Sequence, residues 1–154
     1  MAPLVYAVEP FARAWPDAQE LLRLHWREIA LHQDVIELAP AIHQYENLDK
    51  SGQLLIVTAR TLEGQLVGYH ASFVRPHLHY RYSLSAYQDL FYLHPDHRKG
   101  DAAVRLFKMV EGALRERGVE RMFGSCKLEP DLRPLFKRLR WTHHEYGFTK
   151  LLRP

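Results

Sequence analysis

Residues 87–118, YQDLFYLHPDHRKGDAAVRLFKMVEGALRERG, contain a predicted strand, a polar turn and the most regular helical pattern of the chain. Residues 87–94 are mostly aromatic and aliphatic, which favours a strand. After the turn, apolar residues recur at helical spacing up to Gly118, which supplies a left-handed stop. These apolar residues are Ala103, Phe107, Val110 and Leu114. A strand that passes through a turn into a long amphipathic helix is typical of an α/β domain.

The turn itself has the composition of an anion site. Small residues before a helix expose several backbone amides, the helix dipole adds partial positive charge, and Arg98 and Lys99 add formal charge. A diphosphate site and an ordinary strand-to-helix connection both fit this local pattern. The three spaced glycines of a dinucleotide-binding turn are missing, and so is the Gly-Lys-Ser or Gly-Lys-Thr of a Walker-type loop.

The rest of the chain alternates between strand and helix patterns. Asp17 and Glu20 have capping-box spacing and predict a helix over residues 17–32. The other expected elements are a strand at 4–8, a helix at 41–48, a hairpin of strands 53–60 and 66–74, a loop at 76–85, a strand at 119–126, a helix at 131–139 and one or two closing strands within 141–152. The expected architecture is therefore an α/β domain with a mixed sheet of about six or seven strands.

Length and composition narrow the class of protein. With 154 residues, 47% of them hydrophobic, the chain has room for one globular domain, which we assign to residues 1–154. The single cysteine, Cys126, has no partner for an internal disulfide, which favours a reducing, cytoplasmic setting. No apolar run approaches the ~20 residues of a membrane-spanning helix. The net charge of +3 is spread along the chain, so a nucleic-acid partner is not expected.

Two motifs resemble the GNAT superfamily of acetyl-CoA-dependent N-acetyltransferases. The first family motif is Arg or Gln, two residues, Gly, one residue, then Gly or Ala, three residues after a proline. Pro95 sets the register in which Arg98 takes the first position and Ala103 the last. Asp101 then stands in the place of glycine, and we expect it to cap the following helix. A register that starts at His97 restores the glycine but puts histidine first.

The second motif is Leu-Tyr-x-x-x-Gly-Phe, which is matched in spacing by LFKRLRW at residues 135–141. Here Phe136 replaces the tyrosine, and Arg140 and Trp141 replace glycine and phenylalanine. The order of predicted elements resembles this family along almost the whole chain. The resemblance therefore extends from the fold to the expected enzyme class.

The resemblance implies that acetyl-CoA is the co-substrate and an amine the acceptor. In this family the fourth and fifth strands separate, the pantetheine arm lies between them, and the amine attacks the thioester directly. Carried over to this sequence, the expected coenzyme-binding residues are Phe91, Tyr92, Leu93, Arg98, Lys99, Gly100, Asp101, Ala102, Ala103 and Phe136.

Direct transfer needs a group that takes a proton from the attacking ammonium. Asp89, at the start of the predicted fourth strand, is the first choice, and His79 and His143 follow because their pKa values are near neutral. In many members of the family that this chain resembles, the tyrosine that Phe136 replaces protonates the leaving thiolate. Phenylalanine has no such proton, so Tyr146 is the candidate acid. Protonation through water, or departure of the thiolate without an acid, is equally open.

Other functions were weighed on the same residues. The histidines at 77, 79, 143 and 144 lack the partners of a metal site, so none is expected. Cys126 fits a small core residue better than a nucleophile. The His- and Tyr-rich segment 77–82 fits either a base-stacking surface or a wall of the acceptor pocket. The leading function is an N-acetyltransferase that acts on a small amine, a protein lysine or an N-terminus. The two alternatives are a weak or inactive relative that serves as a binding module, and a transferase that uses another acyl donor. A homodimer through a sheet edge is also compatible.

Overall fold

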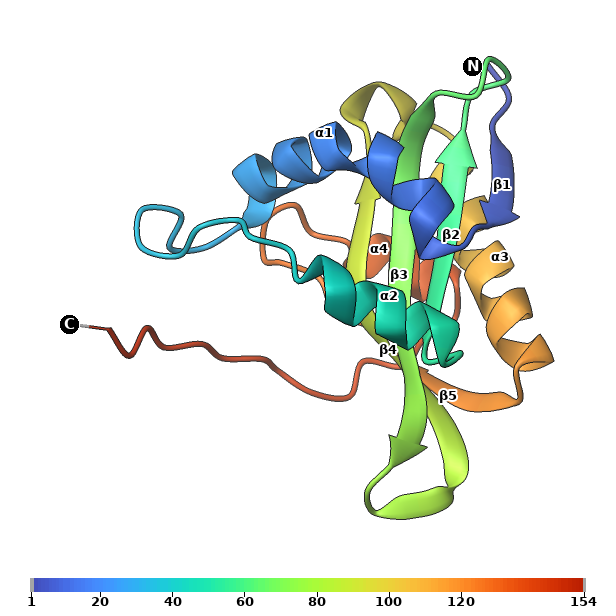
Figure 1. The fold of residues 1–154 in the computed structure, drawn as a ribbon, viewed down its shortest axis with the longest axis vertical. Coiled ribbons are helices and arrows are strands. Elements are labelled where there is room, and N and C mark those ends of the chain that lie inside the picture. Colours follow the sequence, from blue (N-terminus) through green and yellow to red (C-terminus); the bar gives the residue numbers. More distant parts are fainter. Residues whose placement is uncertain (1, 154) are drawn as a thin grey trace.

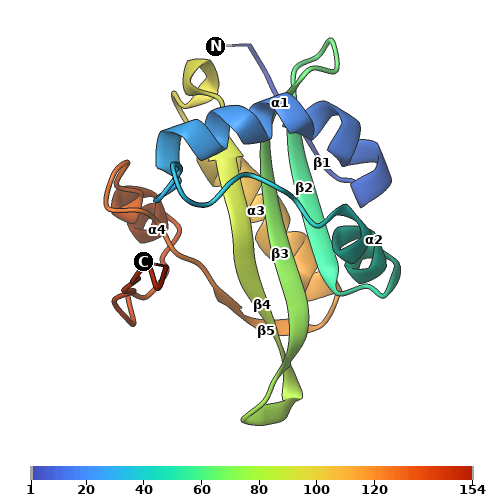
Figure 2. The ribbon, with the colours of Figure 1, turned by 60° about the vertical axis from the view of Figure 1, so that its left-hand side comes forward.

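The computed structural model describes residues 2–153 and contains one five-stranded sheet between two layers of helix (Figures 1 and 2). Neighbouring strands are antiparallel from β1 to β4, and β5 runs parallel to β4. The strands, in spatial order, are β1 (Val5–Val8), β2 (Leu54–Arg60), β3 (Leu66–His77), β4 (Tyr80–Leu93) and β5 (Val119–Phe123). The α/β class is confirmed, but the sheet has five strands rather than six or seven.

The helices cover the two faces of the sheet unequally. Figure 2 shows α1 (Phe11–Ile29) and α2 (Ile42–Lys50) on one face and α3 (Ala102–Glu116) on the other. A short 3₁₀ turn (Pro95–His97) precedes α3, and α4 (Arg133–Arg138) lies beyond β5 along the chain. Because helices pack on both sides, the first six residues of β2 are buried without alternation.

Helix α1 begins at Phe11, six residues before the predicted start at Asp17. Phe11 and Ala14 are buried against Leu54 and Ile56, so tertiary packing extends the helix through Pro16. Asp17 makes no cap; its carboxylate binds Arg60 Nη1 at 2.7 Å. The capping-box prediction is therefore wrong.

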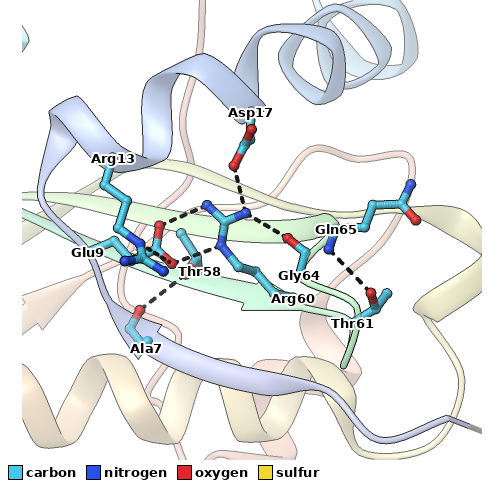
Figure 3. A network of polar contacts seen from close by, with 9 residues as sticks. All are labelled: Ala7, Glu9, Arg13, Asp17, Thr58, Arg60, Thr61, Gly64 and Gln65. Atoms are coloured by element: carbon cyan, nitrogen blue, oxygen red, sulfur yellow. Dashed lines mark hydrogen bonds and ion pairs between the residues drawn. The ribbon is translucent and has the colours of Figure 1, made fainter.

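Arg60 ties the start of α1 to the sheet (Figure 3). Its guanidinium also binds both oxygens of the buried Glu9 carboxylate, at 2.8 and 2.9 Å. The hydrogen bonds from Arg60 hold the pKa of Glu9 below its ordinary value. This ion cluster fixes the N-terminal end of α1.

The predicted loop at residues 76–85 is instead a long hairpin. Strand β3 continues through Pro76, and β4 begins already at Tyr80, so the two strands extend beyond the rest of the sheet (Figure 1). The pairing register shifts beside Pro76, where an irregular ladder tolerates a residue without an amide proton. The His- and Tyr-rich segment therefore forms a projecting finger.

The C-terminal segment was expected to close the sheet. Residues 141–153 have no helix or strand. His144 still lies 5.5 Å from the Phe123 ring of β5, but the side chains of Tyr146, Phe148 and Leu152 are at least 80% exposed. Figure 1 shows the last part of the segment extending away from the sheet. Strand β5 also ends at Phe123 rather than Cys126. The edge of β5 that faces away from β4 is consequently unpaired in the sheet.

No helix within residues 2–153 combines the length and the apolar character that crossing a membrane requires.

Candidate functional site

Strands β4 and β5 separate halfway along β4. Their register runs from Leu84 opposite Val119 to Tyr87 opposite Phe123, and no pair follows. Beyond this point β4 continues to Leu93, paired with β3 alone. The β5 side of residues 88–93 thus offers backbone groups outside the sheet pairing, as the pantetheine slot of the family resemblance requires.

A β-bulge lies where the two strands part. Ser72 is paired with Gln88 and Ala71 with Leu90, so Asp89 is the extra residue of β4. Bulges turn a side chain out of the regular alternation and are common next to active sites. The bulge directs the Asp89 carboxylate toward α2, where Tyr45 Oη donates a 2.5 Å hydrogen bond to Oδ2.

The environment of Asp89 suits a proton acceptor. Partial burial raises the pKa of Asp89 above its ordinary value, and the hydrogen bond from Tyr45 offsets part of that rise. The Tyr45 pKa is raised in turn, first by burial and then by the neighbouring carboxylate. Asp89 therefore binds a proton more readily than a solvated carboxylate, while Tyr45 stays protonated and fixes its orientation.

The turn before α3 presents backbone donors beyond the C-terminal end of β4. Gly100 has a φ of 73°, a left-handed conformation that glycine adopts without strain. The first helical bond of α3 joins Arg105 N–H to Asp101 O at 2.9 Å. The amides of residues 102–104 precede it and have no carbonyl one turn earlier to bind.

Asp101 occupies the N-cap position of α3 without a side-chain cap bond. Its carboxylate pairs with Arg105 Nε at 2.8 Å, so the expected cap interaction is absent and the charge is balanced one turn along the helix. Ala102 is buried, Ala103 is partly buried against the core, and Lys99 is exposed.

Arg98 connects this turn to α1. Its Nε donates to Leu93 O at 2.8 Å, and its Nη2 lies 2.6 Å from Glu28 Oε2. The guanidinium carbon is 5.2 Å from the centroid of the Tyr92 ring, and Tyr92 Oη donates to the same Glu28 oxygen at 3.0 Å. Hydrogen bonds from Arg98 and Tyr92 keep the pKa of Glu28 below its ordinary value. Arg98 thus holds the turn against α1, and its charge is shared with a carboxylate.

Aromatic side chains cover the α3 side of the region where the strands part. Phe91 and Phe136 both meet Phe107 edge-on, at centroid distances of 4.8 and 5.6 Å. Trp141 lies 4.9 Å from Phe136, and its ring is so close to Gly124 that an added Cβ would meet it at 2.7 Å. Gly124 therefore permits the close approach that seals this wall.

The other three proposed proton-transfer residues lie on the β3–β4 hairpin and on the C-terminal segment. His79 is at the tip of the β3–β4 hairpin, ten residues before Asp89, or roughly 33 Å along an extended strand. His143 and Tyr146 contact each other, with ring centroids 5.0 Å apart, on the exposed C-terminal segment. The hydrogen bond to Asp89 comes from Tyr45, not from any of these three.

Tyr45 and Glu28 are the residues that sequence reasoning missed. Both lie on helices that the sequence predicts, but Tyr45 is 44 positions from Asp89, and Glu28 is 70 positions from Arg98. No local pattern links such pairs.

Within residues 2–153 the structure brings together no group of three His, Cys, Asp or Glu side chains suited to a metal ion. His77 and His79 are close, with centroids 5.1 Å apart, yet stand alone on the hairpin. Cys126 is partly buried and unpaired.

Comparison with known proteins places this geometry in a family. The model described as "Acetyltransferase (GNAT) family" matches residues 11–139. No curated protein matches the sequence. Many solved structures resemble the fold.

Three of these structures illustrate the likeness. A ribosomal-protein-alanine N-acetyltransferase from Brucella melitensis biovar Abortus 2308 is 18% identical, with a TM-score of 0.71 over 99% of this chain and 100% of its own. An aminoglycoside acetyltransferase from an uncultured soil metagenomic sample, in complex with trehalose, is 17% identical, with a TM-score of 0.74 over 97% of each chain. A predicted acetyltransferase from Clostridium acetobutylicum, solved with acetyl-CoA, is 16% identical, with a TM-score of 0.66 over 97% of each chain.

Proposed function

The chain belongs to the acetyltransferase (GNAT) family, and from this premise we propose that it transfers an acetyl group from acetyl-CoA to a primary amine. The observation that carries the proposal is the position of Asp89. A bulge places this carboxylate where β4 and β5 part, and burial raises its pKa. A proton acceptor therefore stands beside a slot suited to an extended thiol arm.

Acetyl-CoA fits the donor groups of this region and would supply an activated acetyl thioester. The amides at the start of α3, together with Lys99 and Arg98, would bind its diphosphate. Residues 91–93 of β4 would bind the pantetheine arm through their backbone, and Phe136 would flank it. The structure solved with acetyl-CoA from Clostridium acetobutylicum supports this co-substrate by likeness of fold.

Asp89 would remove a proton from the acceptor ammonium, so that the neutral amine attacks the thioester carbonyl. Tyr45 would keep the carboxylate oriented toward the amine. The new C–N bond forms as the C–S bond breaks, and the thiolate leaves directly or takes a proton from water. Phe136 has no hydroxyl for that step, and Tyr146 lies on the exposed C-terminal segment.

A second candidate function is a binding module that retains the fold with little turnover. The pairing of Arg98 with Glu28, at 2.6 Å, favours it because that guanidinium is already neutralised. The proposal also keeps three expectations from the sequence: a single domain over residues 1–154, a cytoplasmic location and a homodimer.

Calorimetry with acetyl-CoA tests the proposal. We expect binding and a higher Tm at saturating acetyl-CoA. Arg98→Ala should weaken binding by about 1–3 kcal/mol, whereas Lys108→Ala, an exposed charge on α3, should not. Glu28→Gln then separates two roles of Arg98. Tighter binding identifies a direct contact to the diphosphate, and weaker binding identifies a support of the turn. If acetyl-CoA neither binds nor is turned over, the binding-module function, for a different ligand or partner, is the one that remains.

A further inference from the structure

Arginine and aromatic side chains alternate across β3, β4 and β5 next to the β3–β4 hairpin. The Arg75 guanidinium lies 4.9 Å from the Tyr87 centroid, and Tyr87 stacks on Phe123 at 5.2 Å. The Arg121 guanidinium lies 4.8 Å from Phe123 and 5.2 Å from Tyr80. We call these five residues, which come from three neighbouring strands, the arginine–aromatic strip.

The strip lies on the same face of the sheet as Asp89. Tyr87 is paired with Phe73, and the Phe73 ring stacks on Tyr45 at 6.2 Å. Tyr45 in turn donates to Asp89. Arg75 follows Phe73 by two positions and therefore points to the same face. A molecule seated at Asp89 and continuing along β4 toward the hairpin would lie on the strip.

The strip and the hairpin around it are positively charged. Residues 75–88 contain Arg75 and Arg81 and no Asp or Glu, with His77 and His79 near the tip. The acidic residues closest to the strip along the chain are Asp89, two positions after Tyr87 in β4, and Glu120, next to Arg121 in β5. Glu145 lies 3.8 Å from His144. Arg75 and Arg121 are exposed. Aromatic rings beneath a guanidinium orient it, so less side-chain freedom is lost when it binds an anion.

We propose that the acceptor amine belongs to an acidic polypeptide segment, whose carboxylates bind the arginine–aromatic strip while its lysine or N-terminal amine reaches Asp89. This inference rests on the proposed acetyl transfer. Polycationic amines would be repelled by the strip. Nucleic acids match the charge but have no aliphatic amine to acetylate. From Tyr87 to Tyr80 the strand measures roughly 23 Å, which suits an extended chain better than a small molecule.

Acetylation of matched peptides tests the inference. Three peptides would carry one lysine each, flanked by glutamate, by glutamine or by arginine. At low salt we expect kcat/KM for the glutamate peptide to exceed that for the glutamine peptide about five- to tenfold, and the arginine peptide to be the poorest. The preference should shrink as ionic strength rises. Equal kcat/KM values for the three peptides, with acetyl-CoA binding intact, would overturn it.

Charge reversal identifies the surface. Arg75→Glu combined with Arg121→Glu should abolish the preference for the glutamate peptide, and Arg75→Lys with Arg121→Lys should retain most of it. Lys108→Glu makes the same charge change on α3, which covers the other face, and should leave the preference unchanged (Figure 2). A preference that survives the double reversal in a protein with wild-type circular dichroism would refute the strip as the binding surface.

Peptide binding without acetyl-CoA separates this inference from the proposed function. Fluorescence anisotropy of labelled glutamate peptide should show binding that the double reversal removes, even if no acetyl-CoA binds. A single-stranded oligonucleotide of equal charge that displaces the peptide with more than tenfold higher affinity would assign the strip to nucleic acid and overturn the inference.

Discussion

Two titratable side chains flank the point where β4 and β5 part, one on each face of the sheet. Asp89 faces α2, is partly exposed and accepts a hydrogen bond from Tyr45. His70, on β3, faces α3, is fully buried and lies 5.2 Å from the Phe107 ring. Burial shifts both pKa values toward the neutral form, raising that of Asp89 and lowering that of His70 to about 3.

The difference between them is access. Asp89 has a partner that orients it and a route to solvent, so its raised pKa is available for proton transfer. His70 Nε2 and Gln88 Oε1 are buried without a hydrogen-bond partner, and burial outweighs the neighbouring Gln88 side chain, which acts to raise the His70 pKa. A perturbed pKa thus marks a functional candidate only where a substrate can reach the group.

Asp89→Asn should have the largest effect. It removes the proposed proton acceptor and keeps the shape of the side chain, so we expect turnover at neutral pH to fall on the order of 10²–10⁴-fold. The Tm should not fall, because the buried charge is also removed. Wild-type turnover with a wild-type pH profile would exclude Asp89 as the base and remove the contrast with His70.

His70→Leu should change acid stability and leave catalysis unaltered. The folded-state pKa of His70, about 3, lies below its ordinary value of 6.5, so the unfolded chain binds more protons between these values. The stability contributed by neutral His70 is present above about pH 6.5 and is lost as the pH falls, by up to ~1.4 kcal/mol per pH unit.

Urea unfolding between pH 7 and 4 measures this effect. His70→Leu should flatten the dependence, but His25, whose pKa burial lowers to about 4, should maintain part of it. An unchanged slope would show that His70 titrates normally. A large fall in kcat/KM without loss of fold would place it in the reaction.

Tyr45→Phe should have the smallest effect. The hydrogen bond from Tyr45 lowers the Asp89 pKa, so its loss should raise that pKa further and move the acid limb of kcat/KM to higher pH, by about one unit or less. Tyr82→Phe, which alters an exposed ring on the hairpin, is the matched control. If the acid limb of the kcat/KM profile does not shift, this limb does not report the ionisation of Asp89.

Sequence patterns predicted the elements whose stability is local. The apolar spacing from Ala103 to Leu114 and the stop at Gly118 predicted α3 to within two residues, because both signals act within one helix. Strands β2 and β3 were found from their β-rich composition and the turn at Gly64. The turn before α3, with its donors, followed from the same short segment.

The errors fall where distant contacts decide. The helix cap predicted at Asp17 does not form, because burial of Phe11 extends the helix and Asp17 pairs with Arg60 instead. The loop expected from Pro76 is not formed, because cross-strand pairing continues β3 through Pro76 into the hairpin. Residues 141–152 were expected to form one or two closing strands, yet the segment has no strand partner in the sheet.

The sequence by itself determined the α/β class, the long helix and its donor turn, and the residue types at the candidate site. Only the tertiary structure placed Tyr45 on Asp89 and Glu28 on Arg98. The physical reason is that propensity and spacing act over a few neighbouring residues, whereas these pairings join positions 44 and 70 apart through the packing of α1 and α2 on the sheet.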